Sequence, residues 1–378
     1  MRILITSSPG IGHFFPLITT AWALRSAGHE VILATPSNSQ IAEHAGLSVV
    51  DPAPGFDFPG LFRRFMGEYP QPTDMSDGRP TDEWQAGLRF AGKLFAAVSE
   101  PAVDETVRLA QDWRPELIVH GPLNGAGPLA AAVIGVPAIA HGIAPGQGAE
   151  LWQAVAEEMS ESYQRFGVTP VPQAAFLDVS PPSMRPPNST GLSLRYVPYN
   201  GGGLLPTWLT TPRQRARITV TLGSVLPRMA GLGALGQLVS VAGAVDAEFV
   251  FALGGGDLSA LGPLPANVRV VDWTPLHALL NVSDAVVHHG GAGTTMTALV
   301  TATRQLVLPQ GADQYLNAAM VARAGAGAVV KPADLDADRL RGLLADSATA
   351  DAATAVATEI AGQPSPAEVV PAILDLAG

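Results

Sequence analysis

Short apolar runs alternate with segments of helical period from the first residues of the chain. Arg2 to Ser7 is apolar and rich in β-branched residues, Pro16 to Ser26 repeats apolar residues at helical spacing, and Val31 to Ala34 is a second apolar run. Because parallel strands need a crossover between them, this order is typical of a parallel sheet. The N-terminal stretch therefore predicts a β-loop-α-β unit.

The same alternation returns in both halves of the chain. In the first half it predicts strands at Leu117 to Val119 and Pro137 to Ala140, around a helix at Gly125 to Ile134. The second half predicts strands at Ile218 to Leu222, Phe249 to Leu253, Val268 to Val271, Ala285 to Val287 and Gln305 to Leu308, and helices at Leu232 to Val241, Thr294 to Val300 and Asp313 to Ala324. The pattern predicts an α/β fold of two tandem Rossmann-like domains.

Irregular segments rich in Gly and Pro separate these parts. The stretch from Pro198 to Pro212 holds three consecutive glycines and three prolines, which favours an interdomain connection. We expect a first domain over residues 1–205, a linker over 206–212 and a second domain over 213–360. Residues 55–82 are dense in Gly, Pro and Asp, and we interpret them as a flexible flap over a cleft.

Composition narrows the function classes. The 378 residues are 47% hydrophobic and 15% charged, which suits a chain with more than one buried core. The formal net charge of −11 argues against a nucleic-acid partner. The chain has no cysteine, which excludes disulfides and thiolate chemistry and fits the cytoplasm, where we expect the protein. Its most apolar stretch, Pro128 to Ala140, is shorter than the roughly 20 residues of a membrane span, so we expect no integral membrane segment.

The turn after the strand at Ala285 to Val287 carries the clearest candidate chemistry. His288 and His289 end the strand, and Gly290-Gly291-Ala292-Gly293-Thr294 follow. Glycines that open a helix let a ligand approach backbone N–H groups, and the helix dipole favours an anion there. Strand alternation directs His289 to the ligand and His288 to the opposite face. The turn therefore predicts a cradle for a diphosphate.

Three further motifs lie before and after this turn in the sequence. They are Gly12-His13-Phe14-Phe15-Pro16, Asp272-Trp273-Thr274-Pro275 and Pro309-Gln310-Gly311-Ala312-Asp313-Gln314. With them the chain resembles nucleotide-sugar glycosyltransferases of the GT-B type, and most of all the bacterial enzymes that attach deoxysugars to polyketides and other natural products, such as the calicheamicin glycosyltransferases. The resemblance implies two Rossmann-like domains that face each other across a cleft. It also implies a C-terminal helix over residues 361–378 that crosses back to the first domain.

The resemblance assigns donor-binding roles in the second domain. Trp273 would stack on the nucleotide base, a suitable use of a flat apolar surface. His289 and the backbone of Gly290, Gly291, Ala292, Gly293 and Thr294 would bind the diphosphate, with Gly223 and Ser224 nearby. Asp313 and Gln314 would bind the sugar hydroxyls. Each role has a structural alternative: a buried tryptophan, a plain turn, or a helix N-cap at Asp313.

His13 is the candidate general base. A neutral imidazole on the first loop of the first domain could take a proton from an acceptor hydroxyl. Plant members of the resembling family pair this histidine with an aspartate, but the corresponding stretch Ile118 to Asn124 contains no carboxylate. Two explanations stay open. Glu150 or Asp57 orients His13, or the acceptor is an acidic phenol, which would also permit attack through a ring carbon.

The acceptor pocket is expected on the neighbouring loops of the first domain. Its candidate residues are Gly12, Phe14, His120, Asn124 and His141. For His120 and His141 a purely structural, hydrogen-bonded role is the alternative.

Two further motifs are decoys. Gly231 to Gly236 spells GxGxxG, but it does not open directly from a strand, so we interpret it as a chance match. The Asp-x-Asp pattern at Asp334 to Asp338 suits the start of a helix, where acidic groups complement the dipole. We therefore expect no metal and no bound cofactor.

Together these features predict an inverting glycosyltransferase. By the resemblance, it would move a deoxysugar from a nucleoside diphosphate to a hydrophobic aromatic or polyketide-type acceptor through oxygen or carbon. Our choice of dTDP follows from the resembling enzymes, since the sequence itself does not distinguish thymine from uracil. The alternatives are a non-catalytic nucleotide-binding partner of a sister glycosyltransferase and, as a weaker candidate, an NAD-dependent oxidoreductase. Whether the chain forms a homodimer stays open.

Overall fold

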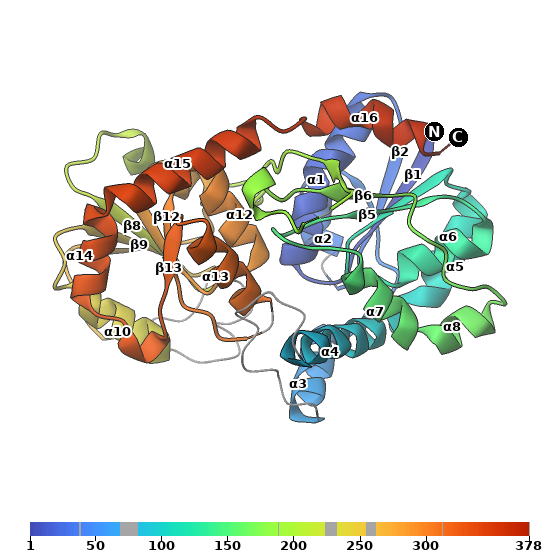
Figure 1. The fold of residues 1–378 in the computed structure, drawn as a ribbon, viewed down its shortest axis with the longest axis horizontal. Coiled ribbons are helices and arrows are strands. Elements are labelled where there is room, and N and C mark those ends of the chain that lie inside the picture. The colour runs from blue at the N-terminus through green and yellow to red at the C-terminus, as the bar shows by residue number, and fades with distance from the viewer. Residues whose placement is uncertain are drawn as a thin grey trace. The chain divides into compact units, whose positions relative to one another are not determined.

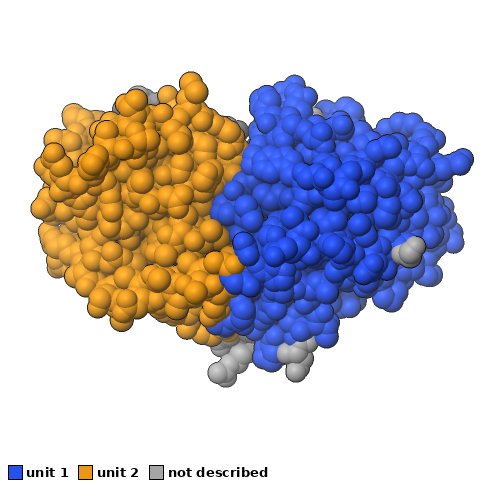
Figure 2. Space-filling model, turned by 90° about the horizontal axis from the view of Figure 1, so that it is seen from above, with its two compact units in different colours: residues 1–199, 362–378 blue, residues 200–361 orange. Residues whose placement is uncertain are grey.

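The computed structural model describes residues 1–377 except 38, 69–81, 188, 224–232, 255–261 and 312. The chain divides into two compact units, shown in different colours in Figure 2. Unit 1 contains Met1–Tyr199 and Gly362–Gly378, and unit 2 contains Asn200–Ala361. Among the described residues no helix is long and apolar enough to cross a membrane.

Unit 1 is built on a seven-stranded sheet of parallel strands in the order β3-β2-β1-β4-β5-β6-β7. The strands are β1 (Arg2–Thr6), β2 (Glu30–Ala34), β3 (Ser48–Val50), β4 (Leu117–His120), β5 (Ala138–His141), β6 (Ala175–Asp178) and β7 (Leu192–Ser193). The helices are α1 (Ile11–Ser26), α2 (Ser39–Glu43), α3 (Phe58–Glu68), α4 (Asp82–Ser99), α5 (Val103–Trp113), α6 (Ala126–Ile134), α7 (Glu150–Glu158), α8 (Ser160–Arg165) and α16 (Pro366–Asp375), with 3-10 turns η1 (Glu100–Ala102) and η2 (Pro182–Met184). In Figure 1, α1 and α6 lie beside the strands of this sheet, while α3 lies below α4, away from the strands.

Unit 2 is built on a six-stranded parallel sheet in the order β10-β9-β8-β11-β12-β13. The strands are β8 (Arg217–Thr221), β9 (Glu248–Ala252), β10 (Val268–Val271), β11 (Ala285–His288), β12 (Arg304–Val307) and β13 (Gly327–Val329). The helices are α10 (Gly233–Ala242), α11 (Leu276–Leu280), α12 (Ala292–Val300), α13 (Gln314–Arg323), α14 (Ala337–Ala345) and α15 (Ser347–Ala361), with 3-10 turns η3 (Thr207–Thr210) and η5 (Pro332–Asp334). Both sheets confirm the predicted α/β class with parallel strands.

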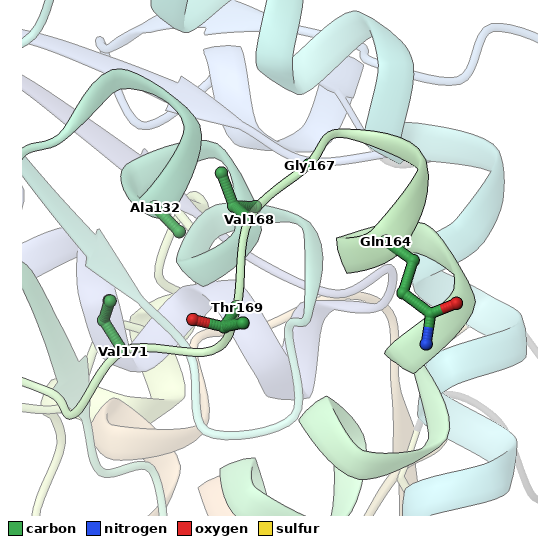
Figure 3. A pocket seen from close by; sticks show the side chains of 6 residues that line it. All are labelled: Ala132, Gln164, Gly167, Val168, Thr169 and Val171. Atoms are coloured by element: carbon green, nitrogen blue, oxygen red, sulfur yellow. The ribbon is translucent and has the colours of Figure 1, made fainter.

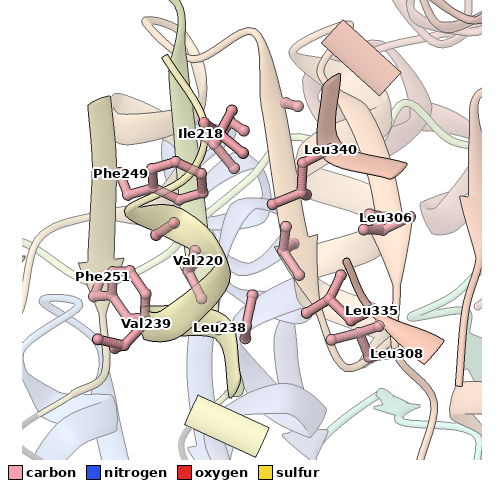
Figure 4. Packing of buried hydrophobic residues seen from close by; sticks show 14 of the residues in the cluster. Ile218, Val220, Leu238, Val239, Phe249, Phe251, Leu306, Leu308, Leu335 and Leu340 are labelled. Atoms are coloured by element: carbon pink, nitrogen blue, oxygen red, sulfur yellow. The ribbon is translucent and has the colours of Figure 1, made fainter. Parts of the chain in front are cut away.

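Both faces of the four central strands of the unit 2 sheet are buried, as expected for a parallel sheet covered by helices. Alternate strand residues such as Phe249 and Phe251 pack with α10 and α14, while Val250 belongs to a different cluster with Leu279 of α11. Figure 4 shows the larger cluster, with Ile218, Val220, Leu238, Val239, Leu306, Leu308, Leu335 and Leu340 labelled beside the two phenylalanines. The period of two along each strand thus gives each face its own core.

Two segments differ from the sequence-based expectation. Residues 206–212 were predicted to be a linker, but they lie within unit 2, where Leu209 of η3 is buried with Val250 and Leu279. The guanidinium groups of Arg217 and Arg269 lie 4.9 and 4.8 Å from the ring of Trp208, which also ties η3 to unit 2.

The other difference is in the expected flap over residues 55–82. Part of it is helix α3, because Phe65 is buried against Leu94 and Val98 of α4. Residues 69–81 of this stretch lie outside the described part.

The C-terminal helix belongs to unit 1. Helix α16 packs against α1 and buries Val369, Val370 and Ile373. Its N-terminus has a capping box, in which the Ser365 side chain accepts from the Glu368 N–H and the Glu368 carboxylate accepts from the Ser365 N–H. The segment that follows Ala361 is thereby fixed to unit 1.

Candidate functional site

The loops after β8 and β11 meet at the switch point of the unit 2 sheet. The chain continues from β8 outward to β9 and β10 on one side, and from β11 to β12 and β13 on the other. Ligands of open parallel sheets bind at the carboxyl ends of the strands where the order reverses in this way. The loop after β8 carries Gly223, and the loop after β11 carries His289.

The imidazole of His289 lies between two glycines. A Cβ atom at Gly223 would lie 2.6 Å from Cε1 of His289, and a Cβ atom at Gly291 would lie 2.4 Å from its Nε2. Any larger residue at either position would push the ring away. The structure therefore brings Gly223, His289 and Gly291 together, as predicted from the sequence. Both glycines are required because a larger side chain would collide with the His289 ring.

Gly290 has a different reason to be glycine. Its φ of +91° is in the left-handed region, and a Cβ atom would lie 2.9 Å from the carbonyl oxygen of Gln314. The turn between β11 and α12 thus needs glycine for its backbone conformation as well as for its packing.

Burial sets the protonation state of His289. It lowers the pKa of the imidazole to about 4, while the Thr221 backbone acts in the opposite direction. The ring is therefore neutral at neutral pH. Its Nδ1 is buried and has no hydrogen-bond partner among the described residues.

Both ring nitrogens of His288 form hydrogen bonds within the protein. It is fully buried, its Nδ1 accepts from the Gly290 N–H at 3.1 Å, and its Nε2 therefore carries the proton and donates to Oε1 of Gln305 at 2.9 Å. The predicted opposite orientations of His288 and His289 agree with these contacts.

Helix α12 begins at the same turn. Its N-cap is Gly291, and no side chain caps its first N–H groups among the described residues. A Cβ atom at Gly293 would meet no atom within 4 Å, so the first turn of the helix borders open space. Ala292 is buried and Thr294 half-buried. Uncapped N–H groups at a helix N-terminus form a site for an anion. Ser224, the other residue predicted near the phosphates, lies outside the described residues.

Helix α13 is fixed to this turn by a residue that the sequence interpretation missed. Asn317 is buried, and its Nδ2 donates to the Gly290 carbonyl at 2.8 Å and to Oδ2 of Asp313 at 3.1 Å. The spacing of Asp313 and Asn317, four residues apart at the start of a helix, was the available signal. Asn317 links the candidate sugar-binding carboxylate to the candidate diphosphate turn.

Asp313 and Gln314 lie at the N-terminus of α13. Asp313 is the N-cap residue, yet its side chain makes no capping hydrogen bond, so the structural alternative of a simple cap does not hold. Oε1 of Gln314 accepts from the Gln310 N–H at 3.0 Å, which leaves its amide group oriented by the protein. Their contact with a sugar stays a prediction.

Trp273 follows β10 and is 45% exposed. A Cβ atom at Gly201 would lie 3.0 Å from its Cζ2, so the indole is supported by glycine backbone of the same unit. This is not the buried structural tryptophan of the alternative interpretation. Its stacking on a base stays a prediction.

His13 lies in the first turn of α1 in unit 1. Its ring meets the ring of Phe95 from α4 edge-on, with centroids 5.2 Å apart and planes at 63°. Burial lowers the pKa of His13 to about 4. No hydrogen bond or ion pair to its ring is found among the described residues.

Neither of the two acidic residues suggested as partners of His13 makes a described hydrogen bond or ion pair with it. Asp57 caps α3, since its Oδ1 accepts from the Gly60 N–H at 2.9 Å. Glu150 is the first residue of α7 and makes no described ion pair with His13. In the described part of the chain, a His–carboxylate dyad is therefore not found at His13.

The residues expected around an acceptor are mostly committed to the interior of unit 1. Phe14 is fully buried. Oδ1 of Asn124 accepts from Oγ1 of Thr6 at 2.8 Å and from the Gly127 N–H at 2.9 Å, which joins β1 to the start of α6. Only Gly12 is exposed.

His120 and His141 are also buried, and both ring nitrogens of each are engaged. His120 contacts the Gly121 carbonyl at 2.9 Å and Gln173 at 2.7 Å. His141 contacts the Gly142 carbonyl at 2.7 Å and Oγ1 of Thr20 at 2.8 Å. For these residues the structural alternative replaces the expected pocket-lining role, because buried polar groups must be satisfied by the protein.

A separate shallow depression of about 540 Å³ lies on unit 1 between the end of α6 and the segment after α8 (Figure 3). It is lined by Ala132, Gln164, Gly167, Val168, Thr169 and Val171. None of the predicted site residues lines it. The described residues also contain no cluster of three or more His, Asp or Glu side chains that could hold a metal ion.

Known proteins share this organisation along the whole chain. Residues 22–223 match the family described as erythromycin biosynthesis protein CIII-like, N-terminal domain, and residues 236–376 match its C-terminal domain. The elloramycin glycosyltransferase ElmGT of Streptomyces olivaceus is 39% identical over 98% of this chain and 96% of its own length.

Two solved structures extend the comparison to the fold. The glycosyltransferase SnogD from Streptomyces nogalater is 40% identical, with a TM-score of 0.84 over 100% of this chain and 99% of its own. The glycosyltransferase SsfS6 of Streptomyces sp. SF2575, complexed with thymidine diphosphate, is 30% identical, with a TM-score of 0.84 over 99% of both chains. The chain is therefore a glycosyltransferase of the GT-B fold and belongs to the erythromycin biosynthesis protein CIII-like family.

Proposed function

We propose that this glycosyltransferase moves a deoxysugar from dTDP to a hydrophobic polyketide-type acceptor, with inversion at the anomeric carbon. The observation that carries the proposal is the neutral imidazole of His289, held between Gly223 and Gly291 beside the uncapped N-terminus of α12. A preorganised donor and a helix N-terminus are suited to the charge that develops on a departing diphosphate.

The donor would be held by unit 2. The backbone N–H groups of Gly291 to Thr294 and the His289 ring bind the diphosphate, Trp273 stacks on the thymine, and Asp313 and Gln314 bind the sugar. Because the helix terminus supplies the positive potential, no metal ion is required in this proposal. The bound thymidine diphosphate named for SsfS6 supports the choice of nucleotide.

The acceptor would be activated in unit 1. In the transfer, the bond between the anomeric carbon and the diphosphate oxygen breaks, the acceptor oxygen bonds to that carbon, and its proton passes to His13. With a pKa of about 4, His13 is unprotonated at neutral pH and can accept a proton, but it is a weak base. The acceptor hydroxyl is therefore expected to be acidic, as a phenol is, and a C-linked product is open to the same chemistry.

Relatives support the class of sugar and acceptor. Among them is the aclacinomycin-T 2-deoxy-L-fucose transferase of Streptomyces galilaeus, 30% identical over 98% of this chain and 95% of its own length. Its name supports a deoxysugar donor for this chain, and its name together with that of ElmGT supports a natural-product acceptor.

Calorimetric titration with dTDP, UDP and NAD tests the donor half of the proposal. We expect dTDP to bind and NAD not to bind. His289→Ala should weaken the affinity for dTDP by about tenfold or more, roughly 1.4 kcal/mol. Unchanged dTDP affinity in His289→Ala would overturn the assignment of the cradle. NAD binding without dTDP binding would support the alternative of an NAD-dependent oxidoreductase.

A second candidate function is a non-catalytic nucleotide-binding partner. The observation that favours it is that no described carboxylate pairs with His13. Turnover of the purified chain with dTDP-sugars and a panel of phenolic polyketides separates the two functions, since the partner would bind dTDP and turn over nothing alone.

A further inference from the structure

His13 makes a ring contact with Phe95 and has no carboxylate partner among the described residues. A catalytic imidazole needs a fixed orientation, and a carboxylate that accepts from its second nitrogen commonly provides it. Here no described group hydrogen-bonds with the His13 ring. The centroid of the Phe95 ring lies 5.2 Å from that of His13, and a Cβ atom added at Gly10 would lie 3.6 Å from Cδ2 of His13.

Phe95 is itself held in place by the packing of its helix. A Cβ atom at Gly92 would lie 2.6 Å from the carbonyl oxygen of Ala154, so α4 lies directly on the backbone of α7. Leu94 and Val98 of the same helix are buried. A ring carried by so closely packed a helix can fix a neighbouring ring.

We propose that Phe95 is the positioning residue of His13. Its ring meets the imidazole edge-on, sets the plane of that ring and excludes water from it, where a dyad would use a carboxylate. Aromatic pairs prefer such edge-to-face geometry. The inference rests on His13 being the base of the proposed function, and it names what orients that base.

Charged groups do not take part in this device. Helices α1 and α4 and the elements packed against them carry charged side chains, among them Asp57 before α3, Arg89 and Lys93 on α4, and Glu150 on α7. None of them contributes to the lowered pKa of His13, whose one resolved cause is burial. Removal of the Phe95 ring would therefore admit water and let the pKa rise toward 6.5.

NMR titration of the histidine ring protons in the intact chain tests the contact without any substrate. The chain has eight histidines, and His13→Gln identifies the resonance of His13. In the native chain this resonance should move only slightly between about pH 7.5 and pH 5, because its pKa of about 4 lies below this range. In Phe95→Ala it should titrate within that range and lose the ring-current shift that a neighbouring aromatic ring causes.

Two variants separate positioning from packing. Phe95→Tyr keeps the ring and should keep the native titration. Phe90→Ala removes a ring from the same helix and the same cluster, where Phe90 meets Phe65 at 5.3 Å, and should leave the His13 resonance unchanged. A native His13 titration in Phe95→Ala, or an equal shift in Phe90→Ala, would overturn the proposal.

Turnover then distinguishes this inference from the proposed function. If His13→Gln retains full activity, His13 is not the base, whatever the NMR result. If His13→Gln is inactive and Phe95→Ala behaves like the native chain in both kcat and titration, the base stands and Phe95 does not position it. We expect Phe95→Ala to lose roughly tenfold in kcat, with the acidic limb of its pH profile moved to higher pH.

Discussion

The glycines around His289 show how a single missing atom shapes the site. Gly291 has ordinary helix-start dihedrals, with φ of −63°, so alanine would fit its backbone. Its Cβ would nevertheless lie 2.4 Å from Nε2 of His289. We predict that Gly291→Ala displaces the imidazole and weakens dTDP binding by about tenfold or more in calorimetry.

A matched substitution in the same unit controls for this effect. Gly342 lies on the exposed face of α14, and a Cβ there would meet no atom within 4 Å. Gly342→Ala should leave dTDP affinity unchanged and stabilise the helix by about 0.5–1 kcal/mol. Equal dTDP affinities in the two variants would contradict the steric account of Gly291.

Strand-end histidines mark the limit of sequence interpretation at this scale. His120, His141 and His288 are the last residues of β4, β5 and β11, and all three are buried. Their side-chain partners lie 53, 121 and 17 residues away in the chain. Such pairings come from the packing of strands and helices. Strand alternation separates His288 from His289, but no local spacing distinguished His120 and His141 from His13.

At the scale of elements, the sequence interpretation missed helix α3 in a stretch rich in Gly and Pro. Phe58, Leu61, Phe62 and Phe65 of α3 are spaced as one face of a helix, yet the nearby Gly and Pro residues favoured a loop. Tertiary packing against α4 decides the outcome. Residues 206–212 were likewise interpreted as a linker. Leu209 and Trp208 pack on unit 2, but such long-range packing produces no periodic pattern in the local sequence.

The contact between α4 and α7 has a requirement of its own. Gly92 lies where a Cβ would come within 2.6 Å of the Ala154 carbonyl oxygen, which is backbone and cannot rotate away. Gly92→Ala should therefore force the two helices apart and cost about 1–3 kcal/mol, measured by urea unfolding of the whole chain.

The control is a glycine on the neighbouring helix. Gly67 of α3 is exposed, and a Cβ there would meet no atom within 4 Å. Gly67→Ala should not destabilise the chain. If Gly92→Ala is as stable as the native protein, the close approach of the two helices is not what fixes α4.

At the scale of the whole molecule, the two-domain parallel architecture was predictable because it depends on repeated local patterns. The return of residues after Ala361 to unit 1 was not encoded in any such pattern and came from the family resemblance alone. Its physical basis is long-range: Nε2 of Gln363 donates to the Ser180 carbonyl at 2.9 Å, and α16 packs on α1. Both units also share one property that the sequence could not reveal, a histidine held neutral by burial.

That shared property predicts how stability depends on pH. Burial lowers the pKa of His141 in unit 1 to about 4 and that of His288 in unit 2 to about 3, below the 6.5 of the unfolded chain. Between these values the unfolded state binds the proton and the folded state does not, so stability is complete above about pH 6.5 and falls as pH decreases. Each histidine can remove up to about 1.4 kcal/mol per pH unit.

Urea unfolding at about pH 7.5 and pH 5.5 measures this loss, in a range above the ordinary pKa values of carboxylates. We expect lower stability at the lower pH. His288→Gln removes one titrating group, so the difference between its two unfolding free energies should be smaller than in the native chain. That difference compares one variant with itself, and a general loss of packing from the substitution therefore cancels. Stability that is equal or greater at pH 5.5 would mean that these imidazoles find water or a counter-charge in the fold, and the case for neutral histidines, including His289 at the diphosphate turn, would fall with it.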